Sequence, residues 1–196
     1  VTRIIPFKKS FLVCTSKGFI LFLDQFGDDG MNIPIMSEDG KLSEISSSSR
    51  QNKSGLQYNT SETDSTDTVK SQTVEHILKD VSNHRTIPLN CFQLNNNTSF
   101  ILVYNKVLIK INCYGMLEDW RNDILTLDFN CTNAIIFETY LILISESLVH
   151  VYDINKATTL PLNKLIPSQI IKGKKIQLLN TAPDDPDVIL NLSHPN

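Results

Sequence analysis

Two short apolar runs separated by a polar turn recur along the chain. The first copy, SFLVCTSKGFILFLD, covers residues 10–24 and breaks at Ser16-Lys17-Gly18. The segment TYLILISESLVHVYD, residues 139–153, aligns with it without a gap, and SFILVYNKVLIKIN, from Ser99, aligns with one residue fewer in the turn. Apolar runs of this length, bounded by polar turn residues, are typical of β-hairpins. The chain is therefore predicted to use one hairpin at least three times.

Strand signals dominate the rest of the pattern. Strands are predicted at 100–104, 107–113, 124–129, 134–137, 141–145, 148–154 and 174–179. Continuous apolar runs such as LILI predict strands that are covered on both faces. Six hairpin positions are predicted to be buried: Leu12, Phe19, Leu21, Leu141, Val149 and Val151.

One segment, SQTVEHILKDVSN, has a different period. Its apolar residues Val74, Ile77, Leu78 and Val81 recur at the spacing of one helix face, which predicts a short amphipathic helix ending near Asn83. We expect this stripe to pack against the edge of a sheet, and a partner-binding helix is the alternative.

The spacing of the copies indicates the architecture. The second and third copies in chain order start 40 residues apart, which matches the roughly 40 to 45 residues of a four-stranded propeller blade. The first two copies are 89 residues apart, and this favours one period plus an insertion. Residues 43–71 contain 13 Ser or Thr and few large apolar side chains, so they are predicted to form a disordered loop within the domain.

Composition narrows the class of protein. With 196 residues, 41% hydrophobic residues and a net charge of −3, the chain predicts a soluble globular protein with one sizeable core or two small ones. It has no basic stripe for nucleic acid, no apolar run of about 20 residues and no signal-peptide pattern. Its four cysteines are far apart, three of them in apolar runs, which indicates a reducing, cytosolic compartment. The first residue is Val1, which suggests a domain taken from a longer protein.

Candidate chemistry is sparse. The four histidines, His76, His84, His150 and His194, lack the spacing of metal ligands, and no metal or cofactor is predicted. His150 lies in a strand pattern, so a buried, hydrogen-bonded or surface histidine is favoured over a general base. The acidic run Asp184, Asp185 and Asp187 lacks the glycine and terminal glutamate of a calcium loop and is interpreted as a solvated loop. No motif of a phosphate-binding loop or a catalytic nucleophile is present.

The Ser/Thr-rich insertion holds the candidate modification sites. Phosphorylation there would add negative charge to the loop. The candidates are Ser46, Ser47, Ser48, Ser49 and Thr66. A passive spacer is the favoured alternative.

The order of segments resembles a known family. GFILFLDQ is followed by the polar insertion, TVEHILKD, TIPLNCFQLNNNTSFILVYNKVLIKINCYG, Trp120, TNAIIFETYLILISESLVHVYDINKA and KGKKIQLLN. This order is similar to the C-terminal part of the citron homology (CNH) domain, and most similar to the CNH domains of fungal Rho1 guanine nucleotide exchange factors. The counterparts of the family's two strand pairs are residues 100–115 and 140–157, and the likeness covers residues 4–24 and about 72–180. The chain departs from the family at residues 105–108 and in keeping one arginine, Arg121, of an arginine pair.

The resemblance implies an all-β fold, a seven-bladed β-propeller of which residues 1–196 form the C-terminal portion. At about 40 residues per blade, the chain holds three to four blades. The implied function is a non-catalytic, regulatory protein contact in a Rho-family exchange factor. Its partners would be a Rho-family GTPase or other domains of the parent protein, in the cytoplasm, with recruitment to the cell cortex or a membrane. The alternatives are the propeller of a vesicle-tethering Rab effector or of a Ste20- or citron-type kinase, and an enzyme in its own right is the least favoured.

Overall fold

In the part of the chain that the structure describes, the strands form three four-stranded antiparallel sheets and two further strand pairs. The computed structural model describes residues 3–7, 10–23, 30–36, 76–81, 83–94, 98–178 and 190–193. In each four-stranded sheet the strands follow one another in chain order across the sheet. The predicted all-β class is confirmed, and the insertion 43–71 lies outside the described residues.

The strands fall into the sheets as follows. The first sheet comprises β1 (Arg3–Phe7), β2 (Ser10–Cys14), β3 (Phe19–Phe22) and β4 (Met31–Ile33). The second comprises β6 (Pro88–Gln93), β7 (Ser99–Tyr104), β8 (Val107–Asn112) and β10 (Ile124–Thr126). The third comprises β11 (Asn133–Phe137), β12 (Tyr140–Ile144), β13 (Leu148–Asp153) and β14 (Gln169–Lys172).

Smaller elements connect the sheets. A parallel pair joins β5 (Ile35–Met36) to β9 (Met116–Leu117), and an antiparallel pair joins β15 (Lys174–Leu178) to β16 (Leu190–Ser193). A short helix, α2 (Lys156–Thr159), and a 3-10 turn, η3 (Leu162–Lys164), lie between β13 and β14.

The repeated hairpin forms the two middle strands of every four-stranded sheet, as the recurrence predicted. The turn-closing pairs are Cys14 with Phe19, Val103 with Leu108, and Ile144 with Val149. Cys14 and Val103 are 89 residues apart, and Val103 and Ile144 are 41 residues apart. All three turns have the same length. The sequence alignment was therefore wrong by one residue in the third copy and wrong in assigning a shorter turn to the middle one. A slip of one residue moves each side chain to the opposite face of its sheet.

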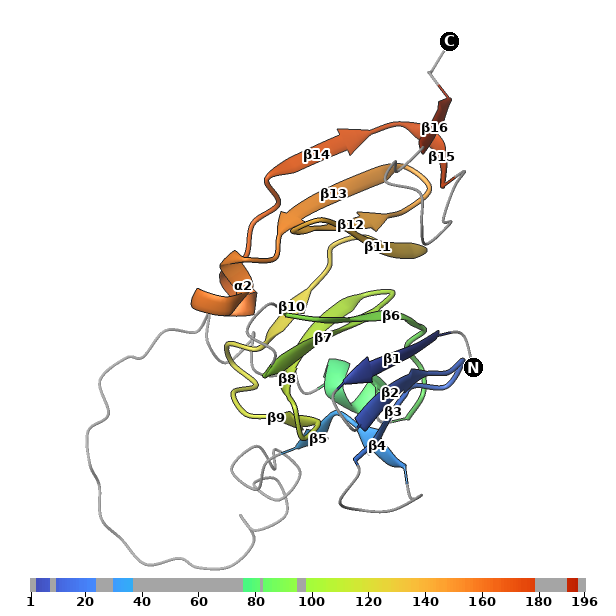
Figure 1. Cartoon of the computed structure of the whole chain (residues 1–196). Helices are drawn as coiled ribbons and strands as arrows, with labels where there is room; N and C mark the ends of the chain where they lie inside the picture. Colours follow the sequence, from blue (N-terminus) through green and yellow to red (C-terminus); the bar gives the residue numbers. More distant parts are fainter. Residues whose placement is uncertain are drawn as a thin grey trace, which may run out of the picture.

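The sheets stack face to face, and their cores lie between them (Figure 1). Leu12, Cys14, Phe19 and Leu21 of the first sheet meet Leu102 and its neighbours on the second. Leu141 and Leu143 of the third sheet meet Ile101, Val103 and Leu108 on the other face of the second. The first two hairpins thus belong to adjacent sheets, which confirms one period plus an insertion.

Five of the six positions predicted to be buried are buried: Leu12, Phe19, Leu21, Leu141 and Val149. Val151 is half-buried instead, because it faces the smaller core cluster toward the two-stranded β15–β16 pair. The strand predicted at 124–129 ends at Thr126. The hydrophobic pattern did not indicate β1, β4, β6 and β14, whose apolar residues are fewer or interrupted by polar ones.

The predicted helix is present as helical residues 76–81. Leu78 and Val81 are each 7% exposed and belong to the core between the first and second sheets, while Val74 lies outside the described residues. Beyond the helical residues lies His84, whose φ of 56° is left-handed and whose backbone N–H donates to Val81 O at 3.1 Å, as at the C-terminal end of a helix. The stripe therefore packs on the sheets, as expected.

Candidate protein-contact surface

The strand order places the connections at two opposite ends of the stacked sheets. At one end, the turn end, lie the β2–β3, β7–β8 and β12–β13 turns and the segments that lead into the next sheet. At the other, the loop end, lie the β8–β10 and β13–β14 connections, residues 113–123 and 154–168. Because β6 contacts β1, β2 and β11 of the neighbouring sheets, the first strands lie on the inner side of the stack and β4, β10 and β14 on the outer side.

Hydrogen bonds tie the turn end closely to the sheets. Asn105, which is 9% exposed, accepts a bond from Ile87 N at 3.0 Å and donates Nδ2 to Asn130 Oδ1 at 2.9 Å. Cys131 N donates to the Asn105 carbonyl oxygen at 2.7 Å, so the β7–β8 turn holds the segment that enters the third sheet. A buried amide group without a hydrogen-bond partner destabilises the folded protein. The bonds of Asn105 therefore stabilise the fold, and we assign a structural role to the turn end.

The other two turns are closed by hydroxyl groups. Thr15 Oγ1 donates to Gly18 O at 2.9 Å, and Ser145 Oγ donates to Leu148 O at 3.1 Å. His84 Nδ1 lies 2.6 Å from Lys17 O, which joins the end of the helical segment to the first turn. The polar atoms of these turns therefore form hydrogen bonds within the protein.

The loop end is anchored but presents apolar side chains to solvent. Leu162 and Leu165 are buried in the core between the second and third sheets. Between them, Asn163 N donates to Asn122 O at 3.1 Å and Asn163 Nδ2 donates to Arg121 O at 2.6 Å. The two loops of this end are therefore held against each other.

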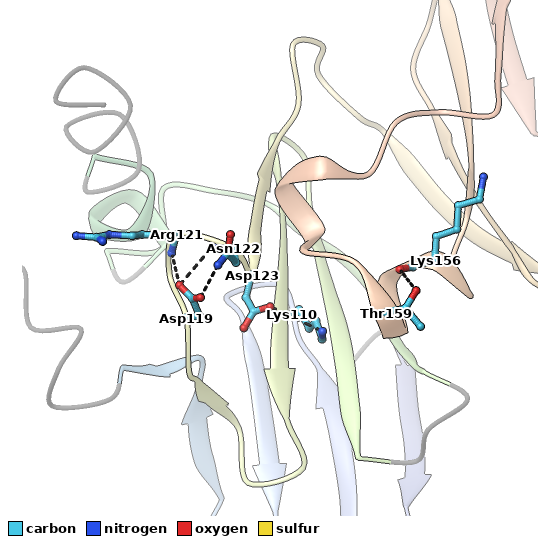
Figure 2. Close-up of polar contacts among 7 residues, drawn as sticks. All are labelled: Lys110, Asp119, Arg121, Asn122, Asp123, Lys156 and Thr159. Carbon is cyan, nitrogen blue, oxygen red and sulfur yellow. Dashed lines mark hydrogen bonds and ion pairs between the residues drawn. The ribbon is translucent and has the colours of Figure 1, made fainter. Parts of the chain in front are cut away.

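Asp119 organises the loop that receives Asn163 (Figure 2). Its carboxylate accepts bonds from Arg121 N at 3.0 Å and from Asn122 Nδ2 at 2.6 Å. Figure 2 also shows Lys110 beside Asp123, with Nζ and Oδ1 3.8 Å apart. Burial raises the pKa of the Asp123 carboxyl, although the Lys110 ammonium acts in the opposite direction. These contacts stabilise the conformation of the loop.

Four of the side chains that are exposed on this end define the candidate site. Leu160 is 44% exposed and Ile166 is 77% exposed, on either side of the η3 turn, of which Leu162 is buried. Arg121 and Lys164 are exposed next to the Asn163 link, and the Arg121 guanidinium lies 5.1 Å from the centre of the Trp120 ring. We call Arg121, Leu160, Lys164 and Ile166 the loop-end surface. Apolar side chains on a rigid support, beside cationic groups, are suited to a protein contact.

The residues singled out in the sequence do not form a reactive centre where they are described. His150 is buried, its Nδ1 lies 3.2 Å from Tyr152 Oη, and its ring packs 4.4 Å from that of Phe129. Burial lowers the pKa of His150, while Asp128 opposes this shift. His150 is a satisfied core histidine, as its strand position predicted.

Other sequence candidates have different outcomes. Ser46 to Ser49, Thr66, His194 and the acidic run at 184–187 lie outside the described residues. Burial raises the pKa of the Cys91 thiol to about 12 and that of Cys131 to about 11, so both remain protonated at neutral pH. Within the described ranges, no three His, Cys, Asp or Glu side chains gather as a metal ion would require. No helix in the same ranges is long and apolar enough to cross a bilayer.

Comparison with known proteins identifies the fold of the chain. No family model matches the chain. The Rho1 guanine nucleotide exchange factor TUS1 of Saccharomyces cerevisiae is 39% identical over 194 residues, which is 97% of this chain and 14% of that protein. The solved structure of the AfRom2 CNH domain aligns with a TM-score of 0.51 at 13% identity, over 92% of this chain and 43% of that one. The chain has the CNH-type β-propeller fold.

The chain thus spans a small part of its curated relative and less than half of the solved CNH domain. The three four-stranded sheets of the described residues agree with that share of the seven-bladed propeller that the resemblance implied. The resemblance to Rho1 exchange-factor sequences is confirmed. The loop-end surface had no sequence signal, because Leu160 and Ile166 look like any other apolar residue of the chain.

Proposed function

We propose that the CNH segment is a non-catalytic contact module of a Rho-family guanine nucleotide exchange factor and acts in Rho1-type GTPase signalling. The observation that carries the proposal is the 39% identity with the exchange factor TUS1 over 97% of the chain. Identity of this level along the whole segment supports a shared role as well as a shared fold.

The loop-end surface is the contact in this proposal. Its partner is a Rho-family GTPase or another domain of the parent protein, and the contact positions or restrains the domains that carry out exchange. The supporting features are the exposed Leu160 and Ile166, the rigid anchoring by Asn163, and the cations Arg121 and Lys164. The proposed setting is the cytoplasm, with recruitment to the cell cortex through the parent protein.

The test is nucleotide exchange on a Rho1-type GTPase by the full-length protein carrying Ile166→Asp. The matched control is Ile87→Asp, since Ile87 is also an exposed isoleucine, at 58%, but lies at the turn end. We expect Ile166→Asp to change the exchange rate or GTPase affinity by about tenfold, as the loss of a central apolar contact does, while Ile87→Asp leaves both unchanged.

Binding to a panel of Rho- and Rab-family GTPases in both nucleotide states completes the test. Preference for Rho1-type proteins would support the proposal. A preference for a GTP-loaded Rab, or an unchanged exchange rate with every loop-end variant, would contradict it.

A further inference from the structure

The outer strands of the three sheets differ in how they are protected. β4, β10 and β14 each end their sheet, so one side of each has no strand beside it in the described part of the chain. The backbone N–H and C=O groups on such a side can pair with a strand from another protein. An edge that lacks protection is therefore a candidate docking site.

Two of these edges are blocked. β4 has three residues, Met31–Ile33, and is followed directly by Pro34, which cannot donate a backbone hydrogen bond. β10 also has three residues, and η3 packs against it, held by the bond from Asn163 N to Asn122 O. Neither edge can accept a further strand without rearrangement.

β14 lacks both forms of protection. Its four residues, Gln169–Lys172, contain no proline, and its ladder pairs it with β13 from Leu148 to Val151. Ile171 packs into the core between β13 and β15, while Ile170 is 50% exposed. An exposed β-branched residue on an open edge is suited to an apolar side chain of an added strand.

The charge around β14 indicates which partner fits. Residues 164–175 contain Lys164, Lys172, Lys174 and Lys175, all exposed, and no Asp or Glu. The adjoining β12–β13 turn contributes Glu146, so the local balance stays positive. A second copy of this chain would bring like charges together, whereas an acidic peptide would complement them.

We propose that β14 is a docking edge for an extended peptide of a protein partner, which adds as a fifth strand to the third sheet. The peptide has apolar residues at alternate positions, one of which covers Ile170, and acidic residues beside Lys172 and Lys174. This inference rests on the proposed function in that both assign protein contacts to the CNH segment. Its test uses Ile170, Lys172 and Lys174, which do not belong to the loop-end surface.

The test measures binding of a fluorescein-labelled probe peptide, two glutamates followed by alternating valine and threonine, to the full-length protein. The probe is also made with the glutamates at its other end, because an added strand can run in either direction. We expect saturable binding of one orientation and slower amide hydrogen exchange at residues 169–172. N-methylation of alternate peptide amides should weaken this binding at least about tenfold, because it removes the ladder hydrogen bonds.

Matched variants localise the effect. Ile170→Asp should weaken binding of the probe about tenfold, while Ile166→Asp on the loop-end surface should leave it unchanged. The double variant Lys172→Glu and Lys174→Glu should lose the acidic probe and bind one in which lysines replace the glutamates. This recovery shows that the charge-reversed protein is still folded.

Equal binding of the N-methylated probe, protection at residues other than 169–172, or pairing of two copies through β14 would each overturn the inference. Its failure is distinct from that of the proposed function. If Ile170→Asp leaves probe binding intact while Ile166→Asp alters exchange on the GTPase, the edge proposal fails and the proposed function stands. The reverse pattern supports the edge and contradicts the loop-end contact.

Discussion

Truncation of Leu141 to alanine tests the one-residue shift that the structure introduces into the repeat. Leu141 is 0% exposed and faces the second sheet, between its ladder partners Ile136 and Tyr152. The change removes three carbon atoms, worth about 0.8 kcal/mol each or about 2.4 kcal/mol together, and the cavity raises the expected cost into the range of about 2 to 5 kcal/mol.

Ile142→Ala is the matched control, since it also removes three carbon atoms from the same strand. Ile142 is only partly buried and faces the smaller cluster around Ile144 and Val149, so we expect a loss of about 1 kcal/mol. The free energy of unfolding is measured by urea titration, followed by the fluorescence of Trp120, the single tryptophan of the chain, which packs against the first core cluster.

The comparison between the two variants decides the outcome. If Ile142→Ala costs as much as Leu141→Ala, the face assignment of β12 is wrong and the gapless alignment of the first and third hairpins is restored. A changed slope of the urea titration would indicate a change in the unfolding process, and the two midpoints would then be compared by thermal unfolding.

Further predictions concern a glycine, a histidine and a buried amide. Gly115→Ala should destabilise the chain by about 1 to 2 kcal/mol, because Gly115 has φ of +83° and an added Cβ would overlap the Ile33 side chain. The control is Gly18→Ala, where a Cβ would lie 3.9 Å from the nearest atom, and its stability should differ from that of the wild type by at most about 0.5 kcal/mol. Both variants are measured by thermal unfolding. Because burial lowers the pKa of His150, the unfolded chain takes up the proton first as the pH falls below about 6.5, so the melting temperature should fall more between about pH 7.5 and 5.5 in the wild type than in His150→Gln. An equal slope in both proteins would exclude His150 as the cause. Asn105→Ala should cost about 1 to 3 kcal/mol in urea unfolding because Ile87 N and Asn130 Oδ1 lose their partner, and a neutral result would show that water replaces the side chain there.

The local pattern of apolar and polar residues was sufficient to predict the elements with strong apolar runs. The three hairpins, the helical stripe at Leu78 and Val81, and the burial of Leu12, Phe19 and Leu141 all follow from periodicity and turn residues, because these act over a few neighbouring positions. The weaker strands β1 and β14 did not have such a signal. Their place in the sheet is decided by pairing with β2 and β13, which the sequence of the strand alone does not encode.

The sequence by itself determined that this protein is an all-β repeat with the segment order of a CNH domain, because hairpin signals are local and the order of segments is preserved along the chain. Tertiary structure alone decided the register of the third hairpin, since strands covered on both faces keep the same apolar pattern after a slip of one residue. It also decided which apolar residues are left outside: Leu162 and Leu165 enter the core, whereas Leu160, Ile166 and Ile170 stay in solvent. Exposure depends on what packs against a side chain from distant parts of the chain, so the two proposed contact surfaces follow from the stacking of the sheets.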